Sequence, residues 1–385
     1  MGRPVTQARP TIICVINEDW FFVSHFLPWA IRAKREGFDV VVLTRMAEAA
    51  RRIAEAGIAV VPASAARRGV VPTGLLAAAG QLKALVKAHQ PAIVHAFGIH
   101  GMSIAALARL RGASFPLVCS ITGLGYLATG RSFVRRALVR ALGFGLRLVL
   151  DRAGTVWLAE NDADGARLGL VAAASQGRHV QLGGAGVDLV DFPAQPMPAG
   201  PGLKLLLVAR MVRSKGIDLA VAAVRQGRSV GGDVSLTLVG APDGDNPGAY
   251  SRAELETFAA EPGVCWLGAQ GDIAALHAAH HAFILPSRGG EGLPKALLEA
   301  SASARPSIVS DVPGCRDAVV DGETGFIVPA GDVAALAEAI AKLAHADRAA
   351  MGAAARLLVE AGSDLEAVSA SVIAVYRRLL ARPKG

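Results

Sequence analysis

Twelve short runs of apolar and β-branched residues recur along the chain, separated by longer, Ala-rich stretches of helical character. Most runs are almost continuously hydrophobic, as expected for strands buried on both faces of a parallel sheet. Their alternation with helical stretches predicts an α/β protein with two doubly wound parallel sheets. The predicted strands are 11–16, 40–44, 59–62, 93–97, 117–121, 156–159, 203–209, 234–240, 264–267, 282–286, 307–310 and 325–328.

A segment rich in proline and glycine separates the two sets of strands. Residues 192–202 contain four Pro and two Gly and show neither a helical nor a strand pattern. We therefore expect an N-terminal Rossmann-like domain over 1–192, a linker over 193–202, a C-terminal Rossmann-like domain over 203–363 and a closing helix over 364–385. Two such domains are expected to bind ligands at the carboxyl ends of their strands.

Composition excludes several classes of protein. Hydrophobic residues make up 52% of the chain and charged residues 19%, which excludes disorder for most of it. The four cysteines are far apart and form no C-x-x-C, so we expect neither a disulfide framework nor a zinc site. The apolar run near the N-terminus is too short for a signal peptide, and no stretch approaches 18 apolar residues. We expect a soluble cytoplasmic protein.

The basic excess lies in the first half of the chain. Residues 1–200 contain 22 Lys and Arg against 12 Asp and Glu, and the remainder contains 18 against 20. This asymmetry indicates an anionic partner for the N-terminal half, such as a membrane surface or a phosphorylated lipid. Nucleic acid is disfavoured, because aromatic residues make up only 5% and no nucleic-acid-binding motif is present.

Two cations follow the first strand of the second half. The predicted strand 203–209 runs into Arg210, and a short loop then presents Lys215 and Gly216 before a helix. A guanidinium, an ammonium and a helix N-terminus together favour a diphosphate. The alternative is a solvated loop with two ordinary surface cations.

A glycine-rich loop with two carboxylates follows the strand 282–286. Glycines let the backbone approach a ligand closely, and Glu291 and Glu299 are spaced so that both can face one cleft. A carboxylate suits the vicinal diol of a ribose or hexose. The alternative is that Glu291 interacts with the helix dipole and that Glu299 is a surface residue.

The string ARMVRSKGID, followed about 75 residues later by GGEGLPKALLEA, resembles the retaining nucleotide-sugar glycosyltransferases of family 4, which have the GT-B fold. Further similar strings are DWFFVSHFLP, IVHAFG, SITGLGYL and LGGAGVDLVDF in the first half, and LVGAPDGDNPGAYS, WLGAQGDI and SDVPGCRDAV in the second. The resemblance implies a metal-independent hexosyltransferase without a cofactor, with a donor that is a UDP-sugar.

The resemblance also assigns roles to residues. It implies that Arg210 and Lys215 bind the donor diphosphate, that Glu291 contacts the transferred sugar and that Glu299 holds the ribose. The backbone at Gly292 and Leu293 would approach the β-phosphate, and the turn containing Gly184 and Gly186 would approach the donor from another side. Two D-x-D strings, Asp162/Asp164 and Asp243/Asp245, are discounted as metal ligands because cations of the protein already offset the diphosphate charge.

The acceptor side departs from the family pattern. Many relatives have a His before a glycine-rich turn, where this chain has Thr122 followed by Gly123. A threonine cannot act as a base near neutral pH, although it can bind a sugar hydroxyl. His95 and His25 are alternatives, although a lone histidine at the end of a strand is more often a structural residue than a ligand-binding one.

An Arg-rich segment of the first half resembles an interfacial helix. Residues 131–152 contain six Arg and one Asp. On a helical wheel Arg136, Arg140 and Arg147 fall within about 40°, with Phe133 and Phe144 beside them. This layout suits an anionic membrane surface. The alternative is a domain helix with a solvated basic face.

Together with the resemblance to bacterial enzymes that extend polyprenyl-diphosphate-linked saccharides, this segment suggests a peripheral enzyme on the inner face of the cytoplasmic membrane. Its acceptor would be a lipid-linked saccharide in polysaccharide or glycoprotein-glycan biosynthesis. Two other functions stay open: a UDP-sugar 2-epimerase-like isomerase and a nucleotide-sugar-binding subunit without turnover. Within the transferase class, a soluble enzyme of sucrose or glycogen type also stays open.

Overall fold

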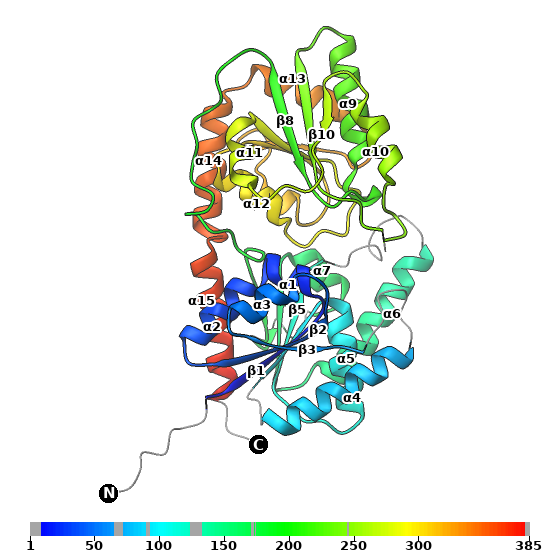
Figure 1. The fold of residues 1–385 in the computed structure, drawn as a ribbon, viewed down its shortest axis with the longest axis vertical. Helices are drawn as coiled ribbons and strands as arrows, with labels where there is room; N and C mark the ends of the chain where they lie inside the picture. The colour runs from blue at the N-terminus through cyan, green and yellow to red at the C-terminus, as the bar shows by residue number, and fades with distance from the viewer. Residues whose placement is uncertain are drawn as a thin grey trace, which may run out of the picture. The chain divides into compact units, whose positions relative to one another are not determined.

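Two parallel β-sheets organise the fold, each flanked by helices on both faces (Figure 1). The computed structural model describes residues 9–64, 72–89, 93–123, 133–170, 173, 175–244 and 246–381. The first sheet has seven strands in the order β3-β2-β1-β4-β5-β6-β7, and the second has six in the order β10-β9-β8-β11-β12-β13. In each sheet the strand order reverses once, at β1/β4 and at β8/β11.

The first half of the chain supplies the first sheet. Its strands are β1 (Thr11–Glu18), β2 (Asp39–Arg45), β3 (Ala59–Pro62), β4 (Ile93–Phe97), β5 (Leu117–Ile121), β6 (Thr155–Ala159) and β7 (His179–Gln181). Its helices are α1 (Asp19–His25), α2 (Leu27–Arg35), α3 (Ala50–Glu55), α4 (Pro72–His89), α5 (Gly98–Leu110), α6 (Phe133–Leu150) and α7 (Asp162–Arg167).

The second half forms the second sheet and the C-terminal helices. Its strands are β8 (Leu203–Val208), β9 (Val234–Val239), β10 (Val264–Trp266), β11 (Ala282–Leu285), β12 (Ser307–Ser310) and β13 (Gly325–Val328). Its helices are α9 (Ile217–Ser229), α10 (Arg252–Ala259), α11 (Ile273–Ala279), α12 (Lys295–Ala302), α13 (Val333–His345), α14 (Arg348–Gly362) and α15 (Leu365–Leu380), with short 3-10 turns η2 (Arg213–Lys215) and η3 (Arg316–Ala318).

All twelve predicted strands are confirmed, to within about two residues at their ends. The strand β7 was not predicted, because its three residues are not fully buried and form no apolar run. The continuous hydrophobic pattern has the expected cause. In β11, Ala282 and Ile284 point into the core beneath α9 and α13, whereas Phe283 and Leu285 point into the core beneath α12. Successive residues of a strand face opposite sides, so a strand covered on both sides is apolar throughout.

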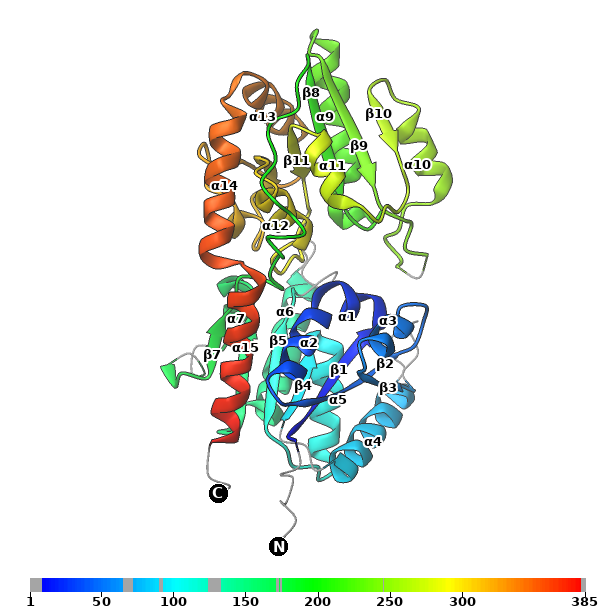
Figure 2. The same cartoon turned by 60° about the vertical axis from the view of Figure 1, so that its left-hand side comes forward.

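Side-chain caps fix the beginnings of several helices in the second half. Asp272, Asp332 and Asp347 each accept a hydrogen bond from the backbone N–H three residues further on, at the starts of α11, α13 and α14. Ser251 and Glu254 form a reciprocal capping box at the start of α10. Such caps satisfy backbone donors that a helix leaves unpaired. Figure 2 shows α14 leading into α15 at the end of the chain.

The chain divides into two compact units whose boundaries differ from the predicted ones. The first unit contains residues 1–122, 138–181 and 369–385, and the second contains 123–137 and 182–368. The predicted linker 193–202 therefore belongs to the second unit. The buried guanidinium of Arg305 explains this, because it donates hydrogen bonds to the carbonyls of Gln195 and Pro196, both at 2.9 Å. The predicted closing helix, α15, begins in the second unit and continues into the first.

None of the helices in the described residues combines the length and the apolar character that crossing a bilayer requires. The four cysteines are unpaired thiols, and Cys14, Cys119 and Cys315 are buried. Burial raises the pKa of the Cys14 thiol to about 12.

Buried histidines predict a loss of stability in acid. Burial lowers the pKa of both His95 and His277 to about 3, from about 6.5 in an unfolded chain. Below pH 6.5 the unfolded chain therefore binds more protons than the folded protein, and stability falls as the pH drops towards 3. Urea unfolding at pH 7.5, 6.0 and 5.0 should show a decreasing free energy of unfolding. The variant His277→Gln should show a shallower decrease, and equal slopes for the two proteins would contradict the assignment.

Candidate active site at the edge of the second sheet

The predicted donor residues lie on loops at the carboxyl ends of β8 and β11. These strands are adjacent and parallel, with Ala282 paired to Leu205 and Phe283 to Leu206. The strand order reverses between them, and in doubly wound sheets such a reversal, at the carboxyl ends of the strands, is where ligands usually bind. The sequence brings two basic residues to the first loop and a glycine-rich segment with Glu291 to the second.

Gly216 holds the first loop against the end of β11. It lies between η2 and α9 with a φ of +71°, a left-handed conformation that favours glycine. A Cβ at this position would lie 2.0 Å from the carbonyl oxygen of Pro286. This close approach places Lys215, the residue before it, directly beside the second loop.

Lys215 and Glu291 form a two-pronged ion pair between the loops. The Lys215 ammonium lies 2.9 Å from Oε1 and 2.7 Å from Oε2 of Glu291. The Ser287 hydroxyl also donates to Glu291 Oε1, at 2.7 Å. Both charged side chains are largely buried. The predicted diphosphate-binding lysine and sugar-binding carboxylate therefore lie side by side, which favours the ligand-site interpretation over a pair of surface charges.

A second charged network, which the sequence did not reveal, joins the same loops. Arg288 donates to both oxygens of Asp218, at 2.8 and 2.7 Å, and its backbone N–H donates to the carbonyl of Ser214. The Tyr250 hydroxyl donates to Asp218 at 2.7 Å. Burial raises the pKa of Tyr250 to about 12, with Asp218 adding to the shift. No motif linked these residues, which are 32 to 70 positions apart.

Glu299 lies in the second turn of α12 and is buried, contrary to the alternative of a surface residue. Its Oε1 accepts a hydrogen bond from the Lys295 ammonium at 2.6 Å. Burial raises the pKa of the Glu299 carboxyl, and Lys295 acts in the opposite direction. Glu291 precedes the helix, which begins at Lys295, so the two carboxylates are held by separate cations on separate backbone segments.

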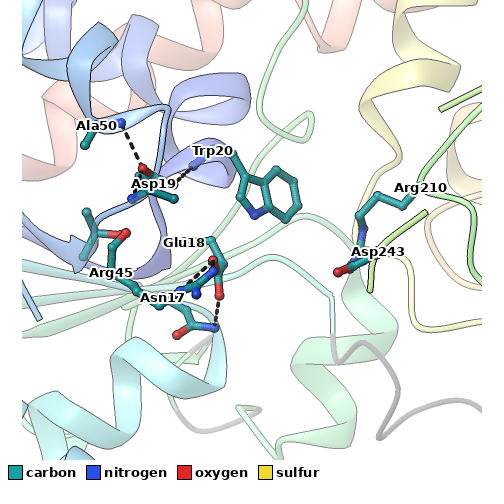
Figure 3. Close-up of polar contacts among 10 residues, drawn as sticks. Asn17, Glu18, Asp19, Trp20, Arg45, Ala50, Arg210 and Asp243 are labelled. Atoms are coloured by element: carbon teal, nitrogen blue, oxygen red, sulfur yellow. Dashed lines mark hydrogen bonds and ion pairs between the residues drawn. The ribbon is translucent and has the colours of Figure 1, made fainter. Parts of the chain in front are cut away.

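Arg210 is paired with Asp243, a residue of one of the discounted D-x-D strings. The Arg210 guanidinium donates to Asp243 Oδ2 at 2.9 Å (Figure 3). Asp245 lies outside the described residues. In the other string, Asp164 accepts hydrogen bonds from Asn161 and Arg167 within α7 and its cap. Within the described part of the chain, no three His, Cys, Asp or Glu residues are grouped so that they could hold a metal ion.

The two predicted glycines of the turn after β7 lie against different parts of the second unit. A Cβ on Gly184 would lie 3.1 Å from the Leu293 side chain and 3.2 Å from Leu298, at the start of α12. A Cβ on Gly186 would instead lie 2.9 Å from the Cα of Leu365, where α15 begins. Gly184 and Leu293, both predicted donor residues, are therefore in contact, whereas Gly186 packs against the C-terminal helix.

Two other glycines enclose the backbone of Gly292. A Cβ on Gly314 would lie 1.6 Å from the Gly292 carbonyl oxygen, and one on Gly123 would lie 2.6 Å from the Gly292 nitrogen. Both glycines have a positive φ. Gly123, predicted on the acceptor side, groups with the second unit and lies against the backbone that carries Glu291.

The acceptor-side residues of the first unit do not share one position. Thr122 lies at the end of β5, with its hydroxyl near Gly98 after β4. His95 is instead completely buried in β4, where its ring nitrogens lie 2.6 Å from the hydroxyls of Tyr376 and Ser120. The structure thus gives His95 a structural role in docking α15 on the sheet. His25 lies at the end of α1, against the ring of Phe21.

Charged residues that no motif singled out lie where β1 ends. Glu18 accepts hydrogen bonds from Arg45, whose Nη2 is 2.6 Å from Oε2, and from Asn17 (Figure 3). Asp19 is completely buried and accepts from the backbone N–H groups of Trp20, Ala47 and Ala50. It therefore fixes the loop before α3 rather than facing a ligand.

The predicted membrane-facing residues divide into two groups. Arg140 and Phe144 of α6 are exposed. Arg147 instead turns towards the protein, where it donates to the carbonyl of Gly169 at 2.7 Å. The side chains of Phe133 and Arg136 lie outside the described residues.

A glycine pair tests the geometry that places Lys215. Gly216→Ala should destabilise the protein by about 1–3 kcal/mol and abolish the UDP binding that the resemblance implies, because the strained φ is combined with a collision at Pro286. Gly231→Ala is the matched control: Gly231 has a φ of +89°, but its Cβ would meet nothing within 4 Å. Thermal unfolding and UDP titration of both variants would measure the difference, and equal effects would contradict a role for the close approach.

Comparison with known protein families identifies the family of the chain. A model described as "Glycosyl transferase 4-like" matches residues 11–151, and one described as "Glycosyl transferases group 1" matches residues 202–346. The capsular polysaccharide biosynthesis glycosyltransferase CapM of Staphylococcus aureus is 32% identical over 35% of each chain. The phosphatidyl-myo-inositol mannosyltransferase of Mycobacterium leprae is 29% identical over 47% of this chain and 50% of that protein. The aligned part thus spans half or less of these relatives.

Solved structures confirm the predicted fold over almost the whole chain. Sucrose-phosphate synthase from Thermosynechococcus elongatus matches 97% of this chain and 100% of its own, with a TM-score of 0.76 and 21% identity. Anabaena HepE, solved with UDP and glucose, matches 95% of this chain and 99% of its own, with a TM-score of 0.75 and 17% identity. With both halves matched by glycosyltransferase models and this architecture, the chain belongs to the group 1 (family 4) glycosyltransferases of GT-B fold.

Proposed function

We propose that the protein is a retaining, metal-independent transferase that moves a hexose or N-acetylhexosamine from a UDP-sugar to a lipid-linked saccharide during assembly of a bacterial surface or glycoprotein glycan. The observation that carries the proposal is the Lys215–Glu291 pair at the carboxyl ends of β8 and β11, with Arg210 on the same loop as Lys215. A cation for a diphosphate and a carboxylate for sugar hydroxyls are adjacent there.

The relatives support the donor and the pathway class. CapM, the colanic acid transferase WcaL and the amylovoran transferase AmsK are named for capsular or exopolysaccharide biosynthesis. HepE, similar in fold, was solved with UDP and with UDP-glucose. These names favour UDP as the nucleotide and a glycan as the product.

The proposed mechanism is electrostatic. In the reaction the bond between the sugar C1 and the β-phosphate oxygen breaks while a bond from the acceptor oxygen to C1 forms on the same face. The leaving diphosphate takes the acceptor proton, so no protein nucleophile is required. Arg210 and Lys215 stabilise the charge that develops on the leaving group, and one such contact typically contributes about 10²–10³-fold in rate. In this proposal the two cations offset the diphosphate charge, which is why a metal ion is not required.

Substitution of the three site residues should separate binding from transfer. Glu291→Ala should abolish transfer while UDP still binds, because this carboxylate contacts the sugar and not the nucleotide. Arg210→Ala or Lys215→Ala should weaken UDP binding itself, because each removes a cation from the diphosphate. Glu256→Ala, which breaks an exposed ion pair on α10, is the control and should change neither property. Undiminished UDP binding in both cation variants would contradict the diphosphate site.

The assay measures release of nucleoside diphosphate from UDP- and GDP-sugars, with and without a bacterial polyprenyl-lipid extract. Release from one UDP-sugar that rises with the extract is the expected result. An isomerised sugar without release would replace the proposal with an epimerase, and tight UDP binding without release from any donor would replace it with a binding subunit.

The exposed face of α6 supports the membrane part of the proposal. Leu138, Phe144 and Leu148 are each more than half exposed. On a helical wheel they fall within about 120° of one another, with the exposed Arg140 about 40° beyond Phe144. An apolar face edged by a cation is typical of helices that lie in an anionic bilayer surface. This face differs from the predicted one, because Arg147 turns away from it and leucines take its place.

Sedimentation with lipid vesicles tests this face. The protein should sediment with phosphatidylglycerol vesicles more than with phosphatidylcholine vesicles. Phe144→Ser/Leu148→Ser should reduce sedimentation about tenfold or more, because about 2–3 kcal/mol of apolar burial per side chain is lost. The control is Leu357→Ser, since Leu357 of α14 is an equally exposed leucine. If the double variant sedimented as much as the wild type, α6 would not be the membrane-binding face.

A further inference from the structure

Lys295 occupies a position that helix energetics disfavour. It is the first residue of α12, and no acidic residue lies in the first turn. The N-terminus of a helix carries partial positive charge, so a cation there is unfavourable and an acid is preferred. The pair with Glu299 offsets this only in part for the helix, because Lys placed four residues before Glu is the weaker of the two orders. The position therefore calls for a reason other than helix stability.

The contacts of the Lys295 ammonium supply that reason. It lies 2.6 Å from Glu299 Oε1 and over the ring of Phe192, 6.0 Å from the ring centre. The Glu299 side chain is only 9% exposed, so its charge is poorly hydrated. Among the described residues, Lys295 is the hydrogen-bond partner of this carboxylate. The aromatic ring and the ion pair together restrict where the ammonium can lie.

Other charged groups near α12 have partners of their own. Arg356 on the packed helix α14 donates to the carbonyls of Phe192 and Ala302 and pairs with Glu360. In the preceding loop, Lys215 pairs with Glu291, and beyond β12 Arg316 pairs with Asp311. Burial raises the pKa of the Glu299 carboxyl, and of these groups Lys295 is the one that opposes the shift.

We propose that Lys295 is a positioning residue that keeps Glu299 ionised and oriented to accept hydrogen bonds from the ribose hydroxyls of the nucleotide. The inference rests on the proposed function, since it requires that a nucleoside diphosphate binds here. An ionised carboxylate is acceptor-only and can receive both hydroxyls of a vicinal diol, whereas the protonated acid loses acceptor capacity. Lys295 acts through Glu299 and does not contact the nucleotide.

Titrations with UDP and 2′,3′-dideoxy-UDP, from pH 5.5 to 8, test this role. Lys295→Met should weaken UDP binding about tenfold at pH 7.5, the usual effect of losing a hydrogen bond to a charged group. Binding to the dideoxy analogue should be unchanged, so the preference for UDP should disappear. As the pH falls, UDP binding by the variant should weaken at a higher pH than that of the wild type, because an unpaired Glu299 takes up its proton earlier. Lys295→Arg should restore the wild-type pH profile.

Two controls separate positioning from a structural effect. Lys342→Met removes the lysine of an exposed Glu338–Lys342 pair on α13 and should leave both ligands and the pH profile unchanged. In a Glu299→Gln background, Lys295→Met should weaken UDP binding less than about twofold further, since residues that act as a unit are non-additive.

Each alternative outcome has a distinct meaning. Equal weakening of UDP and the dideoxy analogue would overturn the inference in favour of a phosphate contact by Lys295. An unchanged pH profile in Lys295→Met would also overturn it, while leaving the donor site intact. If the wild type bound no UDP, the proposed function would fail, and the inference with it.

Discussion

The adjacency of β8 and β11 is the constraint on which the candidate site depends. These strands are neighbours in space but are separated in sequence by β9, β10 and three helices. The strand order reverses between them, and in doubly wound sheets ligands usually bind beside such a reversal, which is where the loops after β8 and β11 lie. Gly216, in the loop after β8, lies in contact with the backbone of Pro286 after β11. The Lys215–Glu291 ion pair also joins these two loops. The close packing of the two loops thus brings the charged side chains within ion-pair distance.

The strands could be predicted because a buried strand needs apolar residues at neighbouring positions of the sequence. A strand covered on both faces must be apolar at successive positions, and all twelve runs of that kind became strands. The linker could not be predicted in the same way. Its prolines and glycines indicate irregular backbone but not which unit the backbone packs on. That choice depends on Arg305, about 110 residues away, whose buried guanidinium binds the carbonyls at 195 and 196.

The candidate site was predictable in its residue types but not in its partners. Arg210, Lys215, Glu291 and Glu299 were identifiable from motif spacing, yet each carries an opposite charge beside it in the structure: Asp243, Glu291, Lys215 and Lys295 respectively. Motif spacing gives the positions of residues along the chain, but it does not show which residues lie close enough in space to form ion pairs. For His95 the sequence left a ligand-binding and a structural role open. Its hydrogen-bond partner Tyr376 lies 281 positions later, so the sequence could not show that His95 is buried.

Each of the four charged site residues is paired with an opposite charge, and this pairing lowers the affinity that the site can offer to an anion. When a diphosphate binds a cation that is already paired with a carboxylate, the existing ion pair must break or share its hydrogen bonds. The net binding free energy is therefore the gain from the new contact minus the loss from the old one. Removing the carboxylates would strengthen attraction for anions in general, including those without a sugar. Under the proposed function, retaining them would tie phosphate binding to the sugar and ribose hydroxyls that the same carboxylates would bind. Under the same proposal, charge pairs that balance within the site would favour a complete nucleotide-sugar over any other diphosphate.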